Sequence, residues 1–415
     1  MLRRDGTLKP DVVLRPPGLN HGSGSWFGVR VQMESTCGLL LVGAWHASGD
    51  GFVNNGRAYV YHFEGSGKPV LSQVLAASDQ NDNHSFGTVA VVPDGSTIAV
   101  GSYGYDGATG CVYMFQKSAG GVFTEIQAIR PTKTGLEPGD CFGLSVCMDE
   151  TATWVVVGAP QYGKQCGATY IFEKDSSARV WMQRARVELE ECDRRENELG
   201  EFGEFVAMEQ RARYCAIAAP TCGAGRGIVY LLDNTNGSWE LGEKLTPPGV
   251  PLGKREYFGT SIAMSGNRMF ISSPGHDEKK GCVYVLERKG ERGSFEFIDT
   301  IEMPDGQRTE GRLFGVSLSC SNNGELLFVS APGHSFLSKE GEKSHVGSVL
   351  LFQDVEGEWI HLATIQDERF KETDEFGLSI SASDRGDAIA IGAWKSGQGE
   401  NSEEGSVSFL SLPMS

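Results

Sequence analysis

The chain has 415 residues, 40% of them hydrophobic, so it can bury a large core and global disorder is not expected. Its formal net charge of −17 disfavours binding to nucleic acid or to an anionic membrane surface. No run of about 18 apolar residues predicts membrane insertion. The N-terminal MLRRDGTLKPDVVLRPPG also lacks the apolar stretch of a secretory signal. We therefore expect an intracellular protein, either cytoplasmic or cytoskeleton-associated.

A Phe-Gly pair recurs seven times along the chain, at intervals of 56 to 62 residues. A period of this length is typical of stacked supersecondary units rather than of one ordinary core. The Phe side chains are expected to wedge between neighbouring units, and the glycines to allow close backbone approach. The pairs are Phe27-Gly28, Phe86-Gly87, Phe142-Gly143, Phe202-Gly203, Phe258-Gly259, Phe314-Gly315 and Phe376-Gly377.

Each Phe-Gly pair is followed by an apolar run that ends in Gly-Ala-Pro or a related triplet, for example TWVVVGAP ending at Pro160. Runs rich in Val and Ile indicate strands buried on both faces. A third element begins with glycine and is apolar and aromatic, as in GCVYMF from Gly110. The fourth element alternates with polar residues, which is typical of a half-exposed outer strand. Each repeat therefore predicts four strands.

The last repeat stops after its third element, which ends at residues 409–412. Residues 8–17, LKPDVVLRPP, resemble the missing fourth strand and precede the first Phe-Gly pair. We expect this segment to complete the seventh unit and close a ring without a covalent bond. The predicted fold is all-β: a seven-bladed β-propeller of four-stranded antiparallel blades, forming a single domain over residues 1–415.

Seven copies of this Phe-Gly, Gly-Ala-Pro and Gly-x-Val-Tyr pattern resemble the FG-GAP propeller of integrin α-subunits and its relatives. Many members of that family carry a calcium loop between the first two strands of a blade, with aspartates at alternate positions. None of the corresponding segments here has a DxDxDG pattern; the nearest is Ser383–Asp387, SDRGD. The chain is therefore expected to be a calcium-free variant, with no metal and no cofactor.

The ten cysteines contain no CxxC pair, and we expect them to be small buried hydrophobic residues.

The loop between the second and third strands is longer in blades 6, 7 and 1 than in blades 2 to 5. Aromatic residues replace the proline of the triplet in blades 7, 1 and 2, and the same pattern puts another aromatic residue shortly after the triplet in blade 3. Two interpretations remain open: the rings form a binding surface, or each ring packs over its own loop. The coincidence with the long loops favours binding. The candidate binding residues are Trp45, Tyr103, Tyr162, Trp394, His334 and Phe336.

No GxSxG, HExxH or P-loop motif is present, and a metal or acid–base pair between His276 and His334 is less favoured than two surface turns. The sequence therefore predicts a protein that is not an enzyme. We expect an interaction platform within a larger assembly, itself a monomeric propeller that binds protein partners. The acidic charge would steer a basic partner surface towards it. The alternative is a propeller that binds a carbohydrate or another small ligand.

Overall fold

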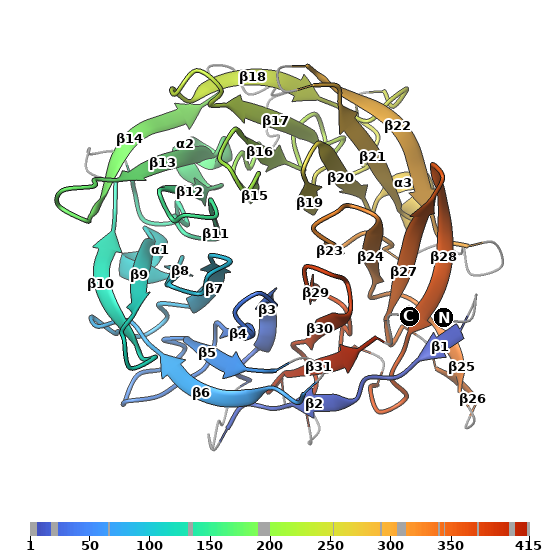
Figure 1. Ribbon diagram of the computed structural model, residues 1–415, viewed down its shortest axis with the longest axis horizontal. Coiled ribbons are helices and arrows are strands. Elements are labelled where there is room, and N and C mark those ends of the chain that lie inside the picture. The colour runs from blue at the N-terminus through green and yellow to red at the C-terminus, as the bar shows by residue number, and fades with distance from the viewer. Residues whose placement is uncertain are drawn as a thin grey trace.

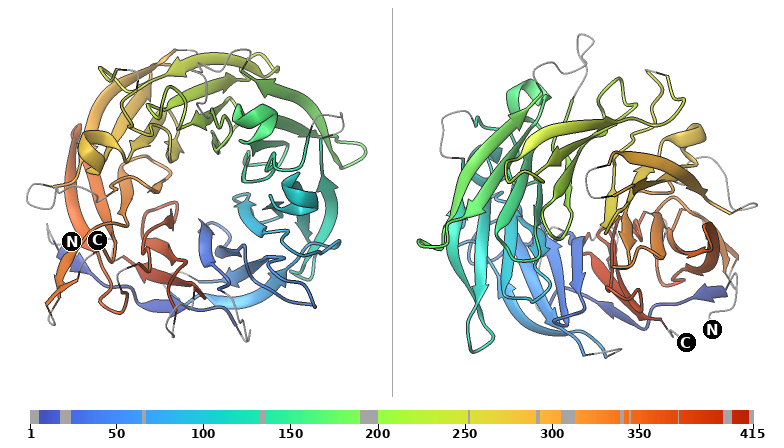
Figure 2. Two further views of the ribbon diagram at one scale, coloured as in Figure 1. Left: turned by 180° about the vertical axis from the view of Figure 1, so that it is seen from behind. Right: turned by 45° about the horizontal axis from the view of Figure 1, so that its top comes forward.

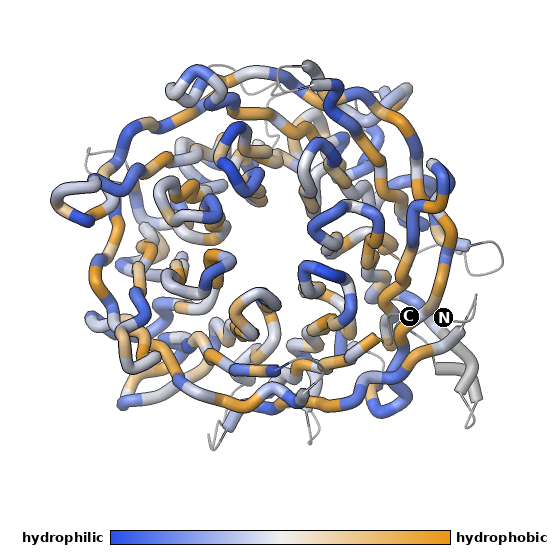
Figure 3. The backbone as a smooth tube through the Cα atoms, in the orientation of Figure 1, coloured by the Kyte–Doolittle hydropathy of each residue, from blue (hydrophilic) through white to orange (hydrophobic). Residues whose placement is uncertain are grey.

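Seven antiparallel sheets stand around a central axis in the computed structural model (Figure 1). The structure describes residues 6–17, 24–64, 67–131, 136–189, 200–251, 253–290, 293–304, 313–338, 341–343, 345–371, 373–397 and 403–412. The predicted all-β, seven-bladed propeller is confirmed. Apolar stretches run along the strands, while hydrophilic stretches gather at the turns (Figure 3).

The first four blades each contain four strands, which follow one another from the axis outward in chain order. Blades 1 and 2 are β3 (Phe27–Glu34), β4 (Leu39–Ala44), β5 (Arg57–His62), β6 (Val70–Leu75), β7 (Phe86–Val91), β8 (Thr97–Ser102), β9 (Cys111–Lys117) and β10 (Phe123–Ile129). Blades 3 and 4 are β11 (Ser145–Met148), β12 (Trp154–Ala159), β13 (Ala168–Lys174), β14 (Trp181–Glu188), β15 (Phe205–Met208), β16 (Tyr214–Ala219), β17 (Ile228–Asp233) and β18 (Glu240–Leu245).

Blade 5 follows the same plan, and blades 6 and 7 add strands from elsewhere in the chain. Blade 5 is β19 (Ile262–Ser265), β20 (Arg268–Ser273), β21 (Cys282–Arg288) and β22 (Phe295–Glu302). Blade 6 is β23 (Leu318–Cys320), β24 (Leu326–Ala331), β27 (Ser348–Val355) and β28 (Glu358–Ile365), with the hairpin β25 (Phe336–Ser338) and β26 (Gly341–Lys343) inserted. Blade 7 is β29 (Ser379–Ala382), β30 (Ala388–Ala393) and β31 (Ser406–Ser411).

The N-terminal segment closes the ring as predicted. Strand β2 (Val12–Leu14) pairs antiparallel with β31 and supplies the fourth strand of blade 7, with Val12 opposite Phe409. A second pairing was not predicted: β1 (Gly6–Leu8) lies parallel to β28 as a fifth strand of blade 6. The first described residues therefore join blade 6 to blade 7 before the chain enters blade 1.

Close packing between neighbouring blades explains the Phe-Gly repeat. All seven phenylalanines of the pairs are fully buried, and the phenylalanine of blade 3, Phe142, packs in one cluster with side chains of blades 2 and 3. The glycine that begins each third strand lies against the backbone of the next phenylalanine. At Gly110, for example, φ is +97° and an added Cβ would lie 1.9 Å from the carbonyl oxygen of Phe142. Glycine is therefore required there for both conformation and space.

Side-chain hydroxyls join the inner strands of neighbouring blades. In the seventh blade, the Ser379 and Ser381 hydroxyls accept hydrogen bonds from the backbone N–H groups of Val31 and Met33 in blade 1, at 2.9 and 2.8 Å. In blade 6, Ser319 Oγ accepts one from the N–H of Ala382 at 2.9 Å. These bonds satisfy backbone donors at the axis, where the inner strands diverge.

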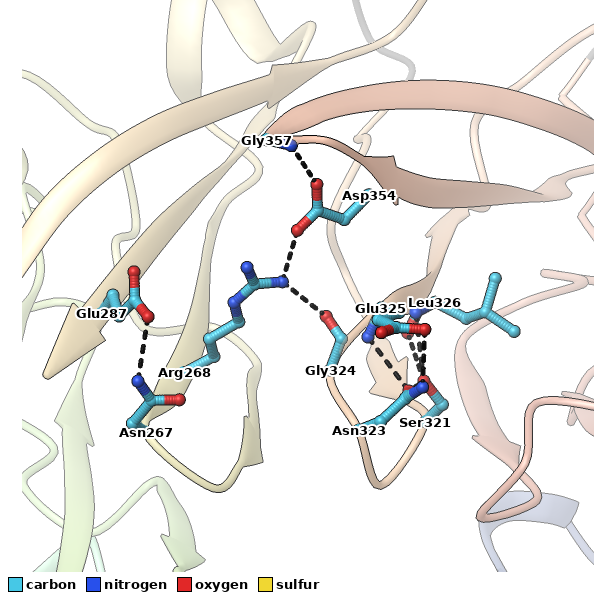
Figure 4. A network of polar contacts seen from close by, with 10 residues as sticks. All are labelled: Asn267, Arg268, Glu287, Ser321, Asn323, Gly324, Glu325, Leu326, Asp354 and Gly357. Atoms are coloured by element: carbon cyan, nitrogen blue, oxygen red, sulfur yellow. Dashed lines mark hydrogen bonds and ion pairs between the residues drawn. The ribbon is translucent and has the colours of Figure 1, made fainter.

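Charged contacts join blades 5 and 6 on one face of the ring (Figure 4). Arg268 pairs with Asp354 at 2.6 Å and donates to the carbonyl oxygen of Gly324 at 3.2 Å. The second carboxylate oxygen of Asp354 accepts the backbone N–H of Gly357 at 2.8 Å. The Asp354 side chain is nearly buried, so these contacts stabilise the packing of blade 5 against blade 6.

Three one-turn helices follow second strands on the opposite face, which we call the GAP face. They are α1 (Tyr105–Ala108), α2 (Tyr162–Gln165) and α3 (His276–Lys279), and the left panel of Figure 2 shows them in front. Within the described ranges, no helix is long and apolar enough to span a membrane.

Candidate functional site: the GAP face of blades 7, 1 and 2

The second strands deliver three of the candidate aromatic residues to the GAP face. Strands β4, β8 and β30 are fully buried apolar runs, and the residue that follows each strand is Trp45, Tyr103 or Trp394. Because blade 7 neighbours blade 1 in the closed ring, these residues occupy three consecutive blades. They nevertheless fall into two separate groups.

The first group, which we call the junction cluster, consists of Trp26, His46 and Trp394. The Trp26 ring stacks on His46, with centroids 3.6 Å apart and planes 24° apart. The edge of Trp394 meets Trp26 at 4.4 Å and 66°. All three side chains are partly exposed. The cluster therefore forms a continuous aromatic surface across the junction between blades 7 and 1.

Carboxylates hold both indole rings of the junction cluster in place. Nε1 of Trp26 donates to Glu403 at 2.8 Å, and Nε1 of Trp394 donates to Glu375 at 2.8 Å. Lys395 also binds Glu375, and its Nζ lies 4.6 Å from the centre of the Trp394 ring. Burial lowers the pKa of His46. The imidazole that stacks on Trp26 is therefore uncharged at neutral pH.

The second group is the pair Trp45 and Tyr103, whose rings meet edge to face at 5.0 Å and 75°. Trp45 is only 9% exposed, because it packs between Tyr103 and the guanidinium of Arg30, whose carbon lies 5.0 Å from the ring centre. Trp45 is thus mainly a packing residue between blades 1 and 2. Trp45 therefore has a packing role, but it packs against the neighbouring blade rather than over its own loop.

The remaining candidate residues lie apart from both groups. Tyr162 belongs to α2 in blade 3, where it packs against the core and under the guanidinium of Arg186 at 5.2 Å. His334 is buried, and its Nδ1 lies 2.7 Å from Ser348 Oγ in the same blade. Phe336 begins β25, and its side chain lies outside the described part of the chain. The structure does not bring Tyr162 or His334 to the junction cluster.

Trp26, His46, Glu375 and Glu403 were not among the residues predicted from the sequence. Trp26 directly precedes the first Phe-Gly pair, a position where no other repeat has a tryptophan. That departure from the repeat was visible in the sequence. Its proximity to Trp394 could be inferred only by combining the departure with ring closure.

A cavity of about 370 Å³ lies on the axis and is lined by the inner strands of all seven blades. Most of its lining side chains are apolar or carry hydroxyl groups. Arg30 from blade 1 and Glu204 from blade 4 are the charged residues of this lining. Neither residue was predicted as a site residue.

His276 in blade 5 lies among polar side chains, but these do not have the geometry of a catalytic triad. His276 Nδ1 lies 2.8 Å from Glu256 Oε2, and Ser273 Oγ donates to that same oxygen at 3.2 Å. Serine and histidine thus share the carboxylate rather than bonding to each other, so the histidine does not activate the serine. His276 bonds to Glu256, whereas His334 bonds to Ser348 in blade 6.

The described ranges also contain His, Cys, Asp and Glu side chains, the residue types that could ligate a metal. These ranges contain no group of three or more His, Cys, Asp or Glu side chains that could hold a metal ion. The nine cysteines in them are free thiols.

Comparisons with known proteins place the chain in the class of β-propellers. No family model matches the sequence, and no curated protein matches it. A solved structure from Bacteroides uniformis, described as "a putative 6-phosphogluconolactonase", is similar with a TM-score of 0.55 and 10% sequence identity. The alignment covers 80% of this chain and 83% of the Bacteroides chain. At this identity the likeness shows the fold alone. The resemblance to FG-GAP propellers stays a prediction.

This likeness overturns one sequence-based prediction. The chain was expected not to be an enzyme, because it lacks familiar catalytic motifs. A propeller of similar fold is nevertheless described as an enzyme, so missing motifs of other folds are no argument against catalysis on this one. The prediction that the protein is not an enzyme is accordingly withdrawn.

Proposed function

We propose that this protein is a binding platform that docks a protein partner on the junction cluster of blades 7 and 1. The observation that carries the proposal is the continuous, partly exposed surface of Trp26, His46 and Trp394. Tryptophan is among the residues most enriched at binding hot spots, where rigid rings bury a large area at low entropic cost.

The hydrogen bonds of the cluster support docking rather than mere exposure. Both indole N–H groups already donate to Glu375 and Glu403. A partner that covers the rings therefore does not bury an indole N–H that lacks an acceptor. The rings are also held in one orientation before binding. Such preorganisation lowers the entropic cost of association.

The charge around the cluster favours a basic partner surface. Glu375 and Glu403 lie beside the rings, and the chain as a whole carries a net charge of −17. Lys395 offsets part of the local charge. Complementary charges at the rim raise the association rate and weaken with salt, so we expect capture of the partner to be salt-dependent.

The test is quantitative affinity capture from the native cell, followed by mass spectrometry. The variant Trp26→Ala/Trp394→Ala should lose a protein that the unmodified chain retains. Trp154 and Trp239 form a matched control, because they are another partly exposed edge-to-face pair, 5.7 Å apart on blades 3 and 4. The control Trp154→Ala/Trp239→Ala should keep the partner.

Both double variants must retain the circular dichroism spectrum of the unmodified protein. Equal recovery of every specific partner by the junction variant, with its fold intact, would overturn the proposal. Equal loss with both variants would likewise show that the junction cluster is not the docking surface.

A further inference from the structure

The axial cavity contains two opposite charges that are not paired with each other. Arg30 comes from the inner strand of blade 1, and Glu204 precedes the inner strand of blade 4, so they approach the cavity from different sides of the ring. Over the described ranges, neither side chain forms an ion pair. Both are partly buried, where a charge without a partner is costly.

Arg30 is held in place without a carboxylate. Its Nη1 donates to the carbonyl oxygen of Val29 at 3.3 Å, and its guanidinium lies 5.0 Å from the centre of the Trp45 ring. A guanidinium has five N–H donors in a fixed plane, so donors remain for a bidentate carboxylate.

A second donor close to Arg30 also lacks a partner. Nε1 of Trp45 is buried and makes no hydrogen bond within the described part of the chain. Buried indole N–H groups usually find an acceptor. Among the described residues, the Trp45 N–H therefore lacks an acceptor on the ring that packs against the Arg30 guanidinium.

Glu204 has the complementary deficiency. Its surroundings hold the acidic Glu201 and the thiol of Cys141, while Arg30 is the cation that acts on it. Burial, followed by the charge of Glu201, raises the pKa of Glu204 to about 7, and Arg30 lowers it only in part. A cationic group brought to Glu204 would stabilise its ionised form.

Most hydroxyl groups in the cavity wall already have hydrogen-bond partners. Hydroxyls such as Ser145, Ser261 and Ser379 already bond to backbone groups of the neighbouring blade. The volume of about 370 Å³ falls in the usual range for small-ligand sites, about 300–1,000 Å³. The two charges are thus the groups of the lining that most need a ligand.

We propose that the axial cavity binds a small zwitterion, with its carboxylate on Arg30 and its ammonium group on Glu204. Each end of such a molecule neutralises one partly buried charge. A simple anion would leave Glu204 unpaired, and a simple cation would leave Arg30 unpaired. The site is independent of the junction cluster, so either proposal can fail alone.

The test is isothermal titration with ω-amino acids of increasing length: glycine, β-alanine and 4-aminobutyrate. Acetate and methylammonium serve as half-ligands. At least one zwitterion should bind saturably, at least tenfold more tightly than either half-ligand. Arg30→Gln and Glu204→Gln should each weaken that zwitterion at least tenfold. Two exposed residues provide controls of equal charge change, Arg385→Gln and Glu240→Gln, which should leave binding unchanged.

Protonation provides an independent readout. The affinity should rise as pH increases from 6 to 8, because Glu204 ionises in that window, and binding at pH 7 should release a proton. If Arg30→Gln does not fold, Arg30→Lys keeps the charge, loses the bidentate geometry and should bind more weakly. The proposal is overturned if no zwitterion binds, if a half-ligand binds equally well, or if the charge controls weaken binding as much.

Discussion

Replacing Gly110 by alanine tests whether the repeat glycines hold neighbouring blades together. The substitution adds a Cβ at φ +97°, 1.9 Å from the carbonyl oxygen of Phe142 and 2.6 Å from its backbone nitrogen. Backbone strain at positive φ costs about 1–3 kcal/mol, and overpacking adds about 1–3 kcal/mol. We therefore expect the free energy of unfolding to fall by roughly 2–6 kcal/mol.

Gly121 in the same blade separates the two contributions. Its φ is +83°, and an added Cβ would meet nothing within 4 Å. Gly121→Ala should therefore show the strain alone, about 1–2 kcal/mol. Equilibrium denaturation in guanidinium chloride, followed by circular dichroism, compares the two variants. Equal destabilisation by both substitutions would refute the role assigned to contact between blades.

Removal of residues 1–17 deletes β1 and β2. This should lower the denaturation midpoint and make blade 7 susceptible to limited proteolysis. An unchanged midpoint would contradict closure of the ring by the N-terminal segment. Burial, followed by Asp384, raises the pKa of Glu34 to about 8. The protonated form of Glu34 therefore stabilises the fold at low pH, and this contribution to the free energy of unfolding is lost as the pH rises from about 4.5 to 8. The loss is at most roughly 5 kcal/mol, and Glu34→Gln should flatten it. Denaturation at several pH values measures the difference. Arg268→Ala leaves the nearly buried Asp354 without its cation and should lower the free energy of unfolding by about 1–3 kcal/mol. A double-mutant cycle with Asp354→Asn should show coupling between the two residues, and additive effects would count against the ion pair.

The repeat made the blades predictable, because each blade must bury the same phenylalanine and bring the same glycine against its neighbour. Closure by Val12–Leu14 followed from a missing fourth strand. The pairing of Gly6–Leu8 with blade 6 could not be predicted, because three residues carry no clear alternation and their partner lies more than 350 residues away. The one-turn helix Tyr105–Ala108 escaped prediction too, since it contains positive φ at Asp106 and Gly107 and has no helical periodicity.

The sequence located the candidate site only to the neighbouring blades 7, 1 and 2. The proline replacements pointed to Trp45 and Trp394, but pattern alone could not show that Trp45 is buried against Arg30 while Trp394 remains partly exposed. That difference depends on side chains of neighbouring strands. Arg30 and Glu204 occupy different repeats, and only the ring geometry brings both to one cavity.

Photo-crosslinking in the native cell tests the docking surface most directly. A photoreactive amino acid replaces Lys395, which lies over the Trp394 ring, or Asn267, which is exposed at the turn between the first two strands of blade 5, on the opposite face. A specific protein adduct that forms from position 395 and not from position 267 is the predicted result. Adducts of equal yield from both positions, or from position 267 alone, would contradict docking at the junction of blades 7 and 1.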